Sequence, residues 1–198
     1  DGHLLPGLQP NGVPEGLAET TIPFKYNDIE ALEKIFTDNK GDMAGIIMEP
    51  IRNEEPRAGF LEKVKELARK NNAVLIFDEI TAGWREITAG MHMKYGIEPD
   101  IAIFGKTISN GFPMAAIIGV DTVMEAAQNT FISSAYFTDR IGPASALKTL
   151  QIHREINAGQ VVSEMGKFVQ MQWALISKSH GINLSIGGIP ALSHFAFD

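Results

Sequence analysis

Four consecutive apolar residues open the segment Val74-Leu-Ile-Phe-Asp-Glu-Ile-Thr-Ala-Gly-Trp-Arg85, and four more lie within Pro99-Asp-Ile-Ala-Ile-Phe-Gly-Lys-Thr-Ile-Ser-Asn-Gly-Phe-Pro113. Continuous apolar runs of this length are typical of strands that are covered on both faces of a sheet. A polar side chain that can take part in chemistry follows closely in each case, Asp78 after the first run and Lys106 after the second. The two segments therefore predict buried strands that carry functional residues at their ends.

The chain around these segments alternates predicted strands with predicted helices. Leu61, Val64 and Leu67 recur at helical spacing, and Asn27 is the expected N-cap of an earlier helix, with the glutamate three residues later completing a capping box. Further strands are expected at residues 45–50, 115–119 and, more weakly, 131–134, and further helices at about 143–157 and 162–176. Residues 1–23 are rich in Gly and Pro and are predicted to be a loop. This alternation predicts an α/β fold with a mainly parallel sheet.

The composition argues against several classes of binding partner and of chemistry. The net charge is −7, and the 17 Lys and Arg residues are scattered rather than clustered, which argues against nucleic-acid binding. No cysteine is present, so disulfides and thiolate chemistry are excluded, and this composition suits a cytoplasmic protein. The first residues lack the basic and apolar regions of a signal peptide, and no apolar run is long enough to span a bilayer, so no membrane association is expected.

The positions of Asp78 and Lys106 suggest a shared site. In open α/β sheets, ligands gather at the carboxyl ends of the strands. A lysine beside apolar residues there would be partly desolvated, which favours the neutral amine that acts as a nucleophile. An aspartate facing the same cleft would hold a positive charge on a heterocycle, and together the two groups are what pyridoxal-phosphate chemistry requires. From position alone, two alternatives stay open: Asp78 is a helix cap or loop anchor, and Lys106 is simply solvated.

Other catalytic motifs are absent or incomplete in the sequence. Gly105-Lys-Thr107 resembles the end of a phosphate-binding loop, but that motif needs a glycine where this chain has Asp100. Asp78 and Glu79 are adjacent on a strand end, so their side chains are expected on opposite faces and not as an acid–base pair. No metal site is expected, because the histidines show no metal-ligand spacing; they are His3, His92, His153, His180 and His194.

The order of several short motifs resembles the class III aminotransferases, which have pyridoxal-phosphate fold type I. The motifs are Phe77-Asp-Glu-Ile80, Tyr95-Gly-Ile-Glu-Pro-Asp100, Phe104-Gly-Lys106 and Gly111-Phe-Pro113, preceded by Ile46-Ile-Met-Glu-Pro50 and followed by Thr138-Asp-Arg-Ile-Gly-Pro-Ala144. The likeness extends over roughly residues 1–180. Within the family it is greatest to the glutamate-1-semialdehyde aminomutase type, because the segment from Asp78 to Tyr95 is short and Gly83-Trp-Arg85 resembles the Gly-Phe-Arg of that type.

The resemblance implies a role for each matching residue. Lys106 would form the covalent imine with the cofactor, pyridoxal 5′-phosphate, and Asp78 would pair with the nitrogen of its ring. Ile80 would pack on one face of the ring. Thr138 would bind the cofactor phosphate across a dimer interface, which implies a homodimer. Glu49 would help to shape the site.

Some positions depart from the family pattern. Thr81 stands where many members have Gln, Ser109 and Asn110 replace glycines, and Arg140 and Ile141 replace Ser-Gly. None of these changes removes an element of the cofactor chemistry. Together, however, they weaken the match to the substrate of the aminomutase type.

The resemblance also implies a domain division and a function. Residues 1–180 would be the central part of the large cofactor-binding domain, and residues 181–198 the beginning of a truncated C-terminal domain, so that the chain is a fragment of one about twice as long. The predicted function is transfer of an amino group within a small amino-aldehyde, as in an aminomutase. Two alternatives stay open: a class III aminotransferase with a separate amine donor and keto acceptor, and an inactive truncated homologue. Residues 1–14 are either part of a lid over the site or a connector.

Overall fold

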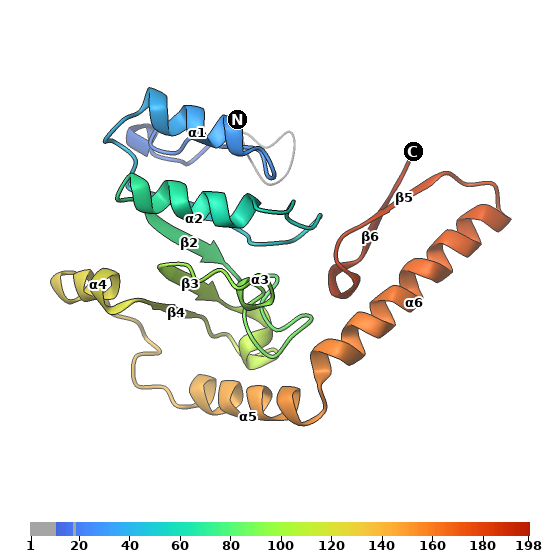
Figure 1. Ribbon diagram of the computed structural model, residues 1–198. Helices are drawn as coiled ribbons and strands as arrows, with labels where there is room; N and C mark the ends of the chain where they lie inside the picture. The colour runs from blue at the N-terminus through green and yellow to red at the C-terminus, as the bar shows by residue number, and fades with distance from the viewer. Residues whose placement is uncertain (1–10, 18) are drawn as a thin grey trace.

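The computed structural model describes residues 11–17 and 19–198 (Figure 1). Its main sheet has four strands in the order β1-β2-β3-β4. They are β1 (Gly45–Met48), β2 (Val74–Asp78), β3 (Ile101–Phe104) and β4 (Ala116–Gly119). The pairs β1–β2 and β2–β3 are parallel, and β3–β4 is antiparallel. The predicted α/β fold with a mainly parallel sheet is therefore confirmed, whereas the lid or connector expected at residues 1–14 lies largely outside the described residues.

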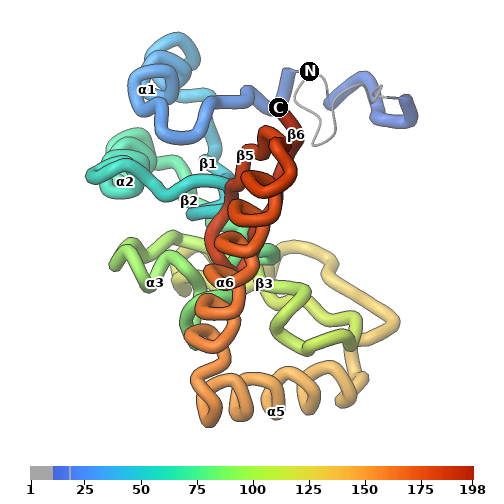
Figure 2. The backbone as a smooth tube through the Cα atoms, turned by 90° about the vertical axis from the view of Figure 1, so that its right-hand side faces the viewer, coloured from blue at the N-terminus to red at the C-terminus, as the bar shows by residue number. Residues whose placement is uncertain are grey.

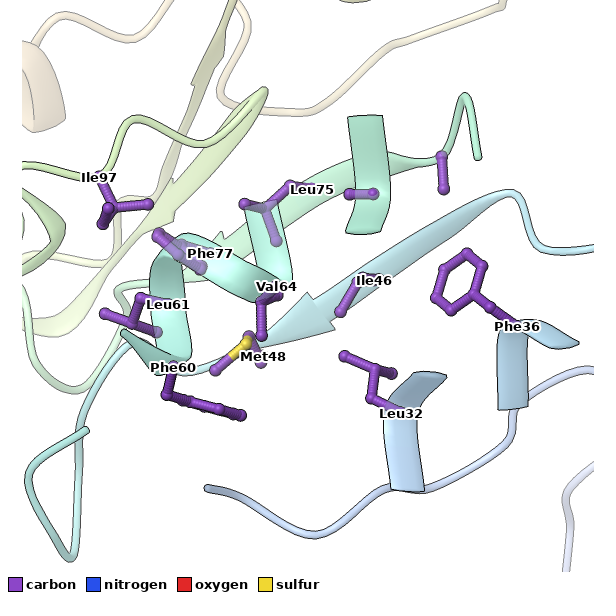
Figure 3. Packing of buried hydrophobic residues seen from close by; sticks show 12 residues of the cluster. Leu32, Phe36, Ile46, Met48, Phe60, Leu61, Val64, Leu75, Phe77 and Ile97 are labelled. Carbon is purple, nitrogen blue, oxygen red and sulfur yellow. The ribbon is translucent and has the colours of Figure 1, made fainter. Parts of the chain in front are cut away.

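Two helices, α1 (Ile29–Asp38) and α2 (Phe60–Lys70), cover one face of the sheet (Figure 1). Side chains alternate along a strand, so Leu75 and Phe77 of β2 share a face, and both are buried against these helices. Figure 3 shows how the buried residues of this core meet; they include Leu32 and Phe36 of α1, Leu61 and Val64 of α2, and Ile46 and Met48 of β1. The helical spacing of the apolar residues thus reflects a real buried face.

The start of α1 differs from the prediction by one residue. Asp28 is the N-cap, and its Oδ1 accepts a hydrogen bond of 3.0 Å from the backbone N–H of Ala31. Asn27 instead has a left-handed backbone, with φ of 64°, and its amide contacts the backbone of Glu55 and Arg57. The predicted Asn27 cap is wrong because a tertiary contact with the loop after β1 occupies that side chain.

The chain also forms several helical elements after β2. They are α3 (His92–Tyr95), the 3-10 helix η2 (Lys106–Ser109), α4 (Asp121–Met124), the 3-10 helix η3 (Glu125–Asn129) and α5 (Ile141–Glu155). The weak strand predicted at residues 131–134 is wrong: these residues form no strand, and Phe131 is 96% exposed. A strand needs a hydrogen-bonded neighbour, and the described chain offers none at this place.

The last part of the chain runs along a long helix and then returns to the loop after β1, where the backbone N–H of Gly188 donates to the Asn53 carbonyl at 3.2 Å. Helix α6 (Ala158–Ser179) leads to the antiparallel pair β5 (Leu184–Gly187) and β6 (His194–Phe197) (Figures 1 and 2). The 3-10 helix η4 (Pro190–Leu192) packs against α6, where a Cβ added to Gly166 would come within 1.9 Å of the Pro190 carbonyl oxygen. Only glycine therefore fits at that contact. None of the described helices is long and apolar enough to cross a membrane.

Candidate active site

The carboxyl ends of β2 and β3 bring Asp78 and Lys106 to the same edge of the sheet. Asp78 is in register with Ile103, and the backbone N–H of Glu79 donates to the Ile103 carbonyl at 2.8 Å. Lys106 follows the end of β3 within two residues, as the first residue of η2. The side chain of Asp78 is fixed at the strand end, because its Oδ1 accepts a hydrogen bond of 2.9 Å from the backbone N–H of Ile80.

Lys106 has an unusual backbone and one defined side-chain partner. Its φ is 45°, a left-handed conformation that costs a non-glycine residue about 1–3 kcal/mol and is concentrated at functional sites. Its Nζ donates a hydrogen bond of 2.7 Å to Oγ1 of Thr81. The side chain is exposed in the described chain, so the expected partial desolvation of Lys106 is not found. The Thr81 contact was missed because nothing in the sequence signals that these two side chains meet.

Ile80 lies beside the glycine that precedes the lysine. A Cβ added to Gly105 would come 3.3 Å from Cγ2 of Ile80, so glycine leaves room for this side chain between the two strand ends. Thr138 is placed elsewhere, exposed in the connection between η3 and α5. No contact found among the described residues joins it to the other three predicted site residues. The chain therefore brings Asp78, Ile80 and Lys106 together and leaves Thr138 apart from them.

Glu79 faces away from Asp78 into the interior, as its place on the strand predicted. It is fully buried and accepts hydrogen bonds from the backbone N–H groups of Met91 and His92, at 2.9 and 2.8 Å. Its Oε1 also lies 2.8 Å from Nδ1 of His92. Glu79 thus fixes the start of α3 to the end of β2. Within the described part of the chain, no group of His, Cys, Asp or Glu side chains suited to a metal ion occurs.

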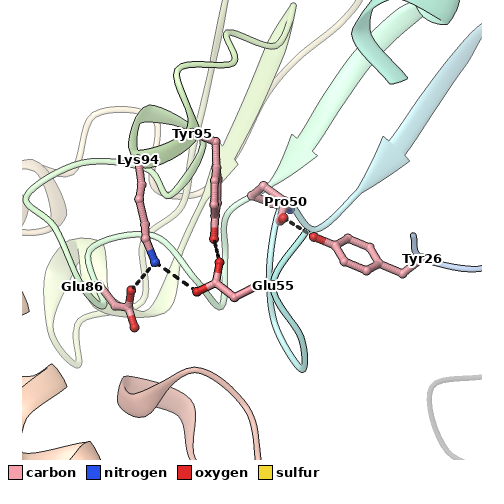
Figure 4. Close-up of polar contacts among 6 residues, drawn as sticks. All are labelled: Tyr26, Pro50, Glu55, Glu86, Lys94 and Tyr95. Carbon is pink, nitrogen blue, oxygen red and sulfur yellow. Dashed lines mark hydrogen bonds and ion pairs between the residues drawn. The ribbon is translucent and has the colours of Figure 1, made fainter. Parts of the chain in front are cut away.

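A polar cluster fastens two loops at this edge (Figure 4). Lys94 Nζ donates to Glu55 at 3.2 Å and to Glu86 at 3.0 Å, and the Tyr95 hydroxyl donates to the second oxygen of Glu55. Burial, followed by the hydrogen bond to Glu55, raises the pKa of Tyr95, so the phenol stays protonated and keeps donating. Burial lowers the pKa of Lys94, but the hydrogen bonds to Glu86 and Glu55 raise it overall. The loop after β1 is thereby tied to the loop after β2.

The loop after β1 also carries charge close to the strand end. Glu49 directly follows β1, and its Oε2 lies 3.2 Å from Nη1 of Arg52 in a half-buried ion pair. The hydroxyl of Tyr26 donates to the carbonyl of Pro50 at 2.6 Å, which fixes the backbone beside Glu49 (Figure 4). Glu49 is therefore held in one orientation at the carboxyl edge of the sheet.

Comparison with known proteins gives the family of the chain. The model of the family described as Aminotransferase class-III matches residues 12–189. The 3-aminobutyryl-CoA aminotransferase of Cloacimonas acidaminovorans (strain Evry) is 34% identical over 193 residues, which cover 94% of this chain and 47% of that protein. The glutamate-1-semialdehyde 2,1-aminomutase of Sulfurihydrogenibium sp. (strain YO3AOP1) is 32% identical, over 95% of this chain and 45% of that protein. The chain thus spans about half the length of the curated relatives it matches.

A solved structure agrees with these relatives. The FumI protein of Sphingopyxis sp. MTA144, solved in its PLP internal aldimine form, matches with a TM-score of 0.84 and 26% identity, over 89% of this chain and 44% of that chain. Its likeness supports fold type I of the pyridoxal-phosphate enzymes for the sheet described above. Because the family model covers most of the chain and the strand order agrees with the expected fold, this chain belongs to the class III aminotransferase family.

Proposed function

We propose that the protein containing this chain transfers amino groups with pyridoxal 5′-phosphate, and that Lys106 is the lysine that holds the cofactor. Family membership and the likeness to FumI indicate this cofactor. The observation that carries the proposal is the meeting of an exposed amine and a strand-end carboxylate at one edge of the sheet, on adjacent parallel strands. Such an edge is where ligands of open α/β sheets bind.

The residues at this edge fit the cofactor. Lys106 supplies the amine for the covalent link, and Ile80 supplies an apolar side chain beside it. Asp78 is held by a single hydrogen bond to one of its oxygens among the described residues, so the carboxylate retains capacity to accept from a protonated ring nitrogen. When bound, pyridoxal 5′-phosphate supplies an electron sink for the bond that breaks at the substrate carbon.

The protein side chains then have separate tasks. With the cofactor bound, the Lys106 amine would move a proton between the substrate carbon and the cofactor carbon. The Thr81 hydroxyl, 2.7 Å from Nζ, holds the amine in position for this transfer. Asp78 would accept a hydrogen bond from the ring nitrogen, which favours the protonated form of that nitrogen.

For the substrate, we propose a small amino-aldehyde such as glutamate-1-semialdehyde, with the amino group moved inside one molecule. The short segment from Asp78 to Tyr95 and the Gly83-Trp-Arg85 motif support this, as does the likeness to a glutamate-1-semialdehyde 2,1-aminomutase. The second candidate is a class III aminotransferase with a separate acceptor, which the 34% identity to a 3-aminobutyryl-CoA aminotransferase favours.

Turnover assays on the whole protein separate these candidates. Glutamate-1-semialdehyde alone, without any donor or acceptor, is expected to give 5-aminolevulinate. A matched reaction supplies 3-aminobutyryl-CoA with a keto acid. Product only in the second reaction would replace the aminomutase with an aminotransferase. Absence of amino transfer in both, and in a panel of amines with keto acids, would contradict the proposed function and favour an inactive homologue.

For assembly, we propose a homodimer in which Thr138 of one subunit binds the cofactor phosphate of the other. The exposure of Thr138 and its separation from Lys106 along the chain are compatible with a partner in another subunit. Thr138→Ala is expected to raise the dissociation constant for pyridoxal 5′-phosphate about tenfold, the effect of one lost hydrogen bond to a charged group. Absorbance titration of the apoprotein measures this, with Thr130→Ala as the control. Tight cofactor binding by a stable monomer would contradict the proposal.

We also propose that residues 1–180 are the central part of the large cofactor-binding domain and residues 181–198 the start of a second domain. The support is the sheet arrangement, in which β5 and β6 pair only with each other, apart from the main sheet. Limited proteolysis of the whole protein is the direct check on this boundary.

A further inference from the structure

The loop between β2 and α3 reaches the proposed catalytic lysine through a short series of contacts. Thr81 accepts the hydrogen bond from Lys106 Nζ, at 2.7 Å. The carbonyl oxygen of Thr81 in turn accepts from Nε of Arg85, at 3.1 Å. Arg85 follows Trp84, whose φ of 58° is a left-handed conformation that bulky residues rarely adopt. Such a backbone persists only where its surroundings hold it.

His153 of α5 supplies the contacts that hold this turn. Its Nε2 lies 2.8 Å from the carbonyl oxygen of Trp84, and its Nδ1 lies 2.9 Å from Oγ1 of Thr88. A carbonyl oxygen only accepts, so Nε2 donates to Trp84, and Nδ1 forms a second hydrogen bond with the Thr88 hydroxyl. The residue is only 7% exposed. Both ring nitrogens of His153 therefore form hydrogen bonds with the loop between β2 and α3.

Packing reinforces the same turn from two sides. A Cβ added to Gly159, at the start of α6, would come within 2.3 Å of the Glu86 carbonyl oxygen, so helix and loop touch backbone to backbone. The Trp84 ring packs on Phe104, with the ring centroids 4.6 Å apart. Phe104 is the last residue of β3, two positions before Lys106. The turn that His153 holds is thus coupled to the lysine both through Thr81 and through the strand end.

We propose that His153 is a positioning residue: it fixes the turn at Trp84 and Arg85, and through Arg85 and Thr81 it fixes the direction of the Lys106 amine. This inference rests on the proposed function, because the direction of the amine matters only if that amine reacts. Displacing a reacting group by about 1 Å is enough to cost up to about 10²-fold in rate. A residue outside the cofactor site therefore influences the rate through the loop it holds.

The test compares two substitutions in the whole protein loaded with pyridoxal 5′-phosphate. His153→Gln keeps an N–H close to the position of Nε2, whereas His153→Phe keeps an aromatic ring and loses both polar contacts. We expect His153→Phe to lower kcat about tenfold with KM within about twofold, and His153→Gln to restore kcat to within about threefold of the natural protein. His180→Phe, an exposed histidine after α6, is the matched control and is expected to leave both constants unchanged.

A second measurement needs no bound cofactor. In the apoprotein, the acylation rate of Lys106 relative to the exposed Lys178 is followed by mass spectrometry. Loss of the ordered contact with Thr81 is expected to raise this ratio about fivefold in His153→Phe, since one net hydrogen bond is worth about that factor. Thr81→Val breaks the last contact of the series without touching His153 and is expected to raise the ratio in the same way, so the inference stays testable if His153→Phe fails to fold.

The outcomes separate the inference from the proposed function. Borohydride reduction of the natural protein reports the function: cofactor fixed on a residue other than Lys106 contradicts the proposed function. If Lys106 carries the cofactor, an unchanged kcat and acylation ratio in His153→Phe overturn the positioning role. Equal losses in His153→Gln and His153→Phe overturn it as well, because the hydrogen bond to Trp84 would then have no part in the effect. An unchanged acylation ratio in Thr81→Val does the same.

Discussion

Lys106→Ala is expected to lower kcat for amino transfer by about 10³-fold or more in the whole protein, because one side chain both anchors the cofactor and moves the proton. Among the described residues, Lys106 is the lysine whose amine contacts Thr81 at the edge formed by β2 and β3. The measurement is single-turnover kinetics with saturating pyridoxal 5′-phosphate. It is paired with borohydride reduction and peptide mapping, which should find the cofactor on Lys106 in the natural protein.

Two controls make this result specific. Lys106→Arg keeps the positive charge but supplies no neutral amine at ordinary pH, so it should be impaired as severely as Lys106→Ala. Lys178→Ala removes an exposed lysine near the end of α6 and should keep full activity. An Ala variant at position 106 that retains more than about a tenth of the natural kcat would contradict a proton-transfer role for Lys106.

Glu79→Ala is expected to reduce the free energy of unfolding by about 3–5 kcal/mol, because it leaves several buried donors without an acceptor, at about 1–3 kcal/mol each. Glu79 is fully buried and accepts from two backbone N–H groups, those of Met91 and His92, and lies 2.8 Å from the His92 ring. All three contacts lose their acceptor in the variant. The measurement is urea unfolding of the natural protein and the variant, followed by circular dichroism.

Two matched variants test whether the loss of stability in Glu79→Ala comes from the buried carboxylate. Glu79→Gln keeps one acceptor oxygen and should cost less, about 1–3 kcal/mol. Lys94→Met removes the ion pairs of Lys94 with Glu55 and Glu86, and it should cost about 1 kcal/mol at most, because partly exposed pairs are screened by water. A loss in Glu79→Ala no greater than that in Lys94→Met would show that the buried carboxylate does not hold α3.

The local sequence pattern was sufficient to predict the two central strands and the direction of the side chains at their ends. The apolar runs ending at Phe77 and Phe104 predicted strands covered on both faces, and both strands are found, with buried residues alternating with half-buried ones. Parallel strands end at the same edge of a sheet, so the order of the strands was enough to place Asp78 and Lys106 at one edge. The opposite orientation of Glu79 followed from the alternation of side chains along a strand. These predictions needed only periodicity and order along the chain.

The errors arose where a distant segment decided the local structure. Asn27 looked like a helix cap, but the loop after β1 contacts its side chain, so Asp28 takes the cap. Residues 131–134 have the composition of a strand but no neighbour to pair with. In both cases the local pattern permits more than one conformation, and contacts far apart in the sequence select among them.

The sequence by itself determined the α/β alternation, the family motifs and the two residues that carry the proposed chemistry. Only the tertiary structure decided which side chains support them. Thr81 meets Lys106 across 25 residues, and His153 reaches Trp84 across 69 residues of chain. The physical reason is that periodicity reports which face a residue takes, whereas a hydrogen bond between separate elements depends on how those elements pack.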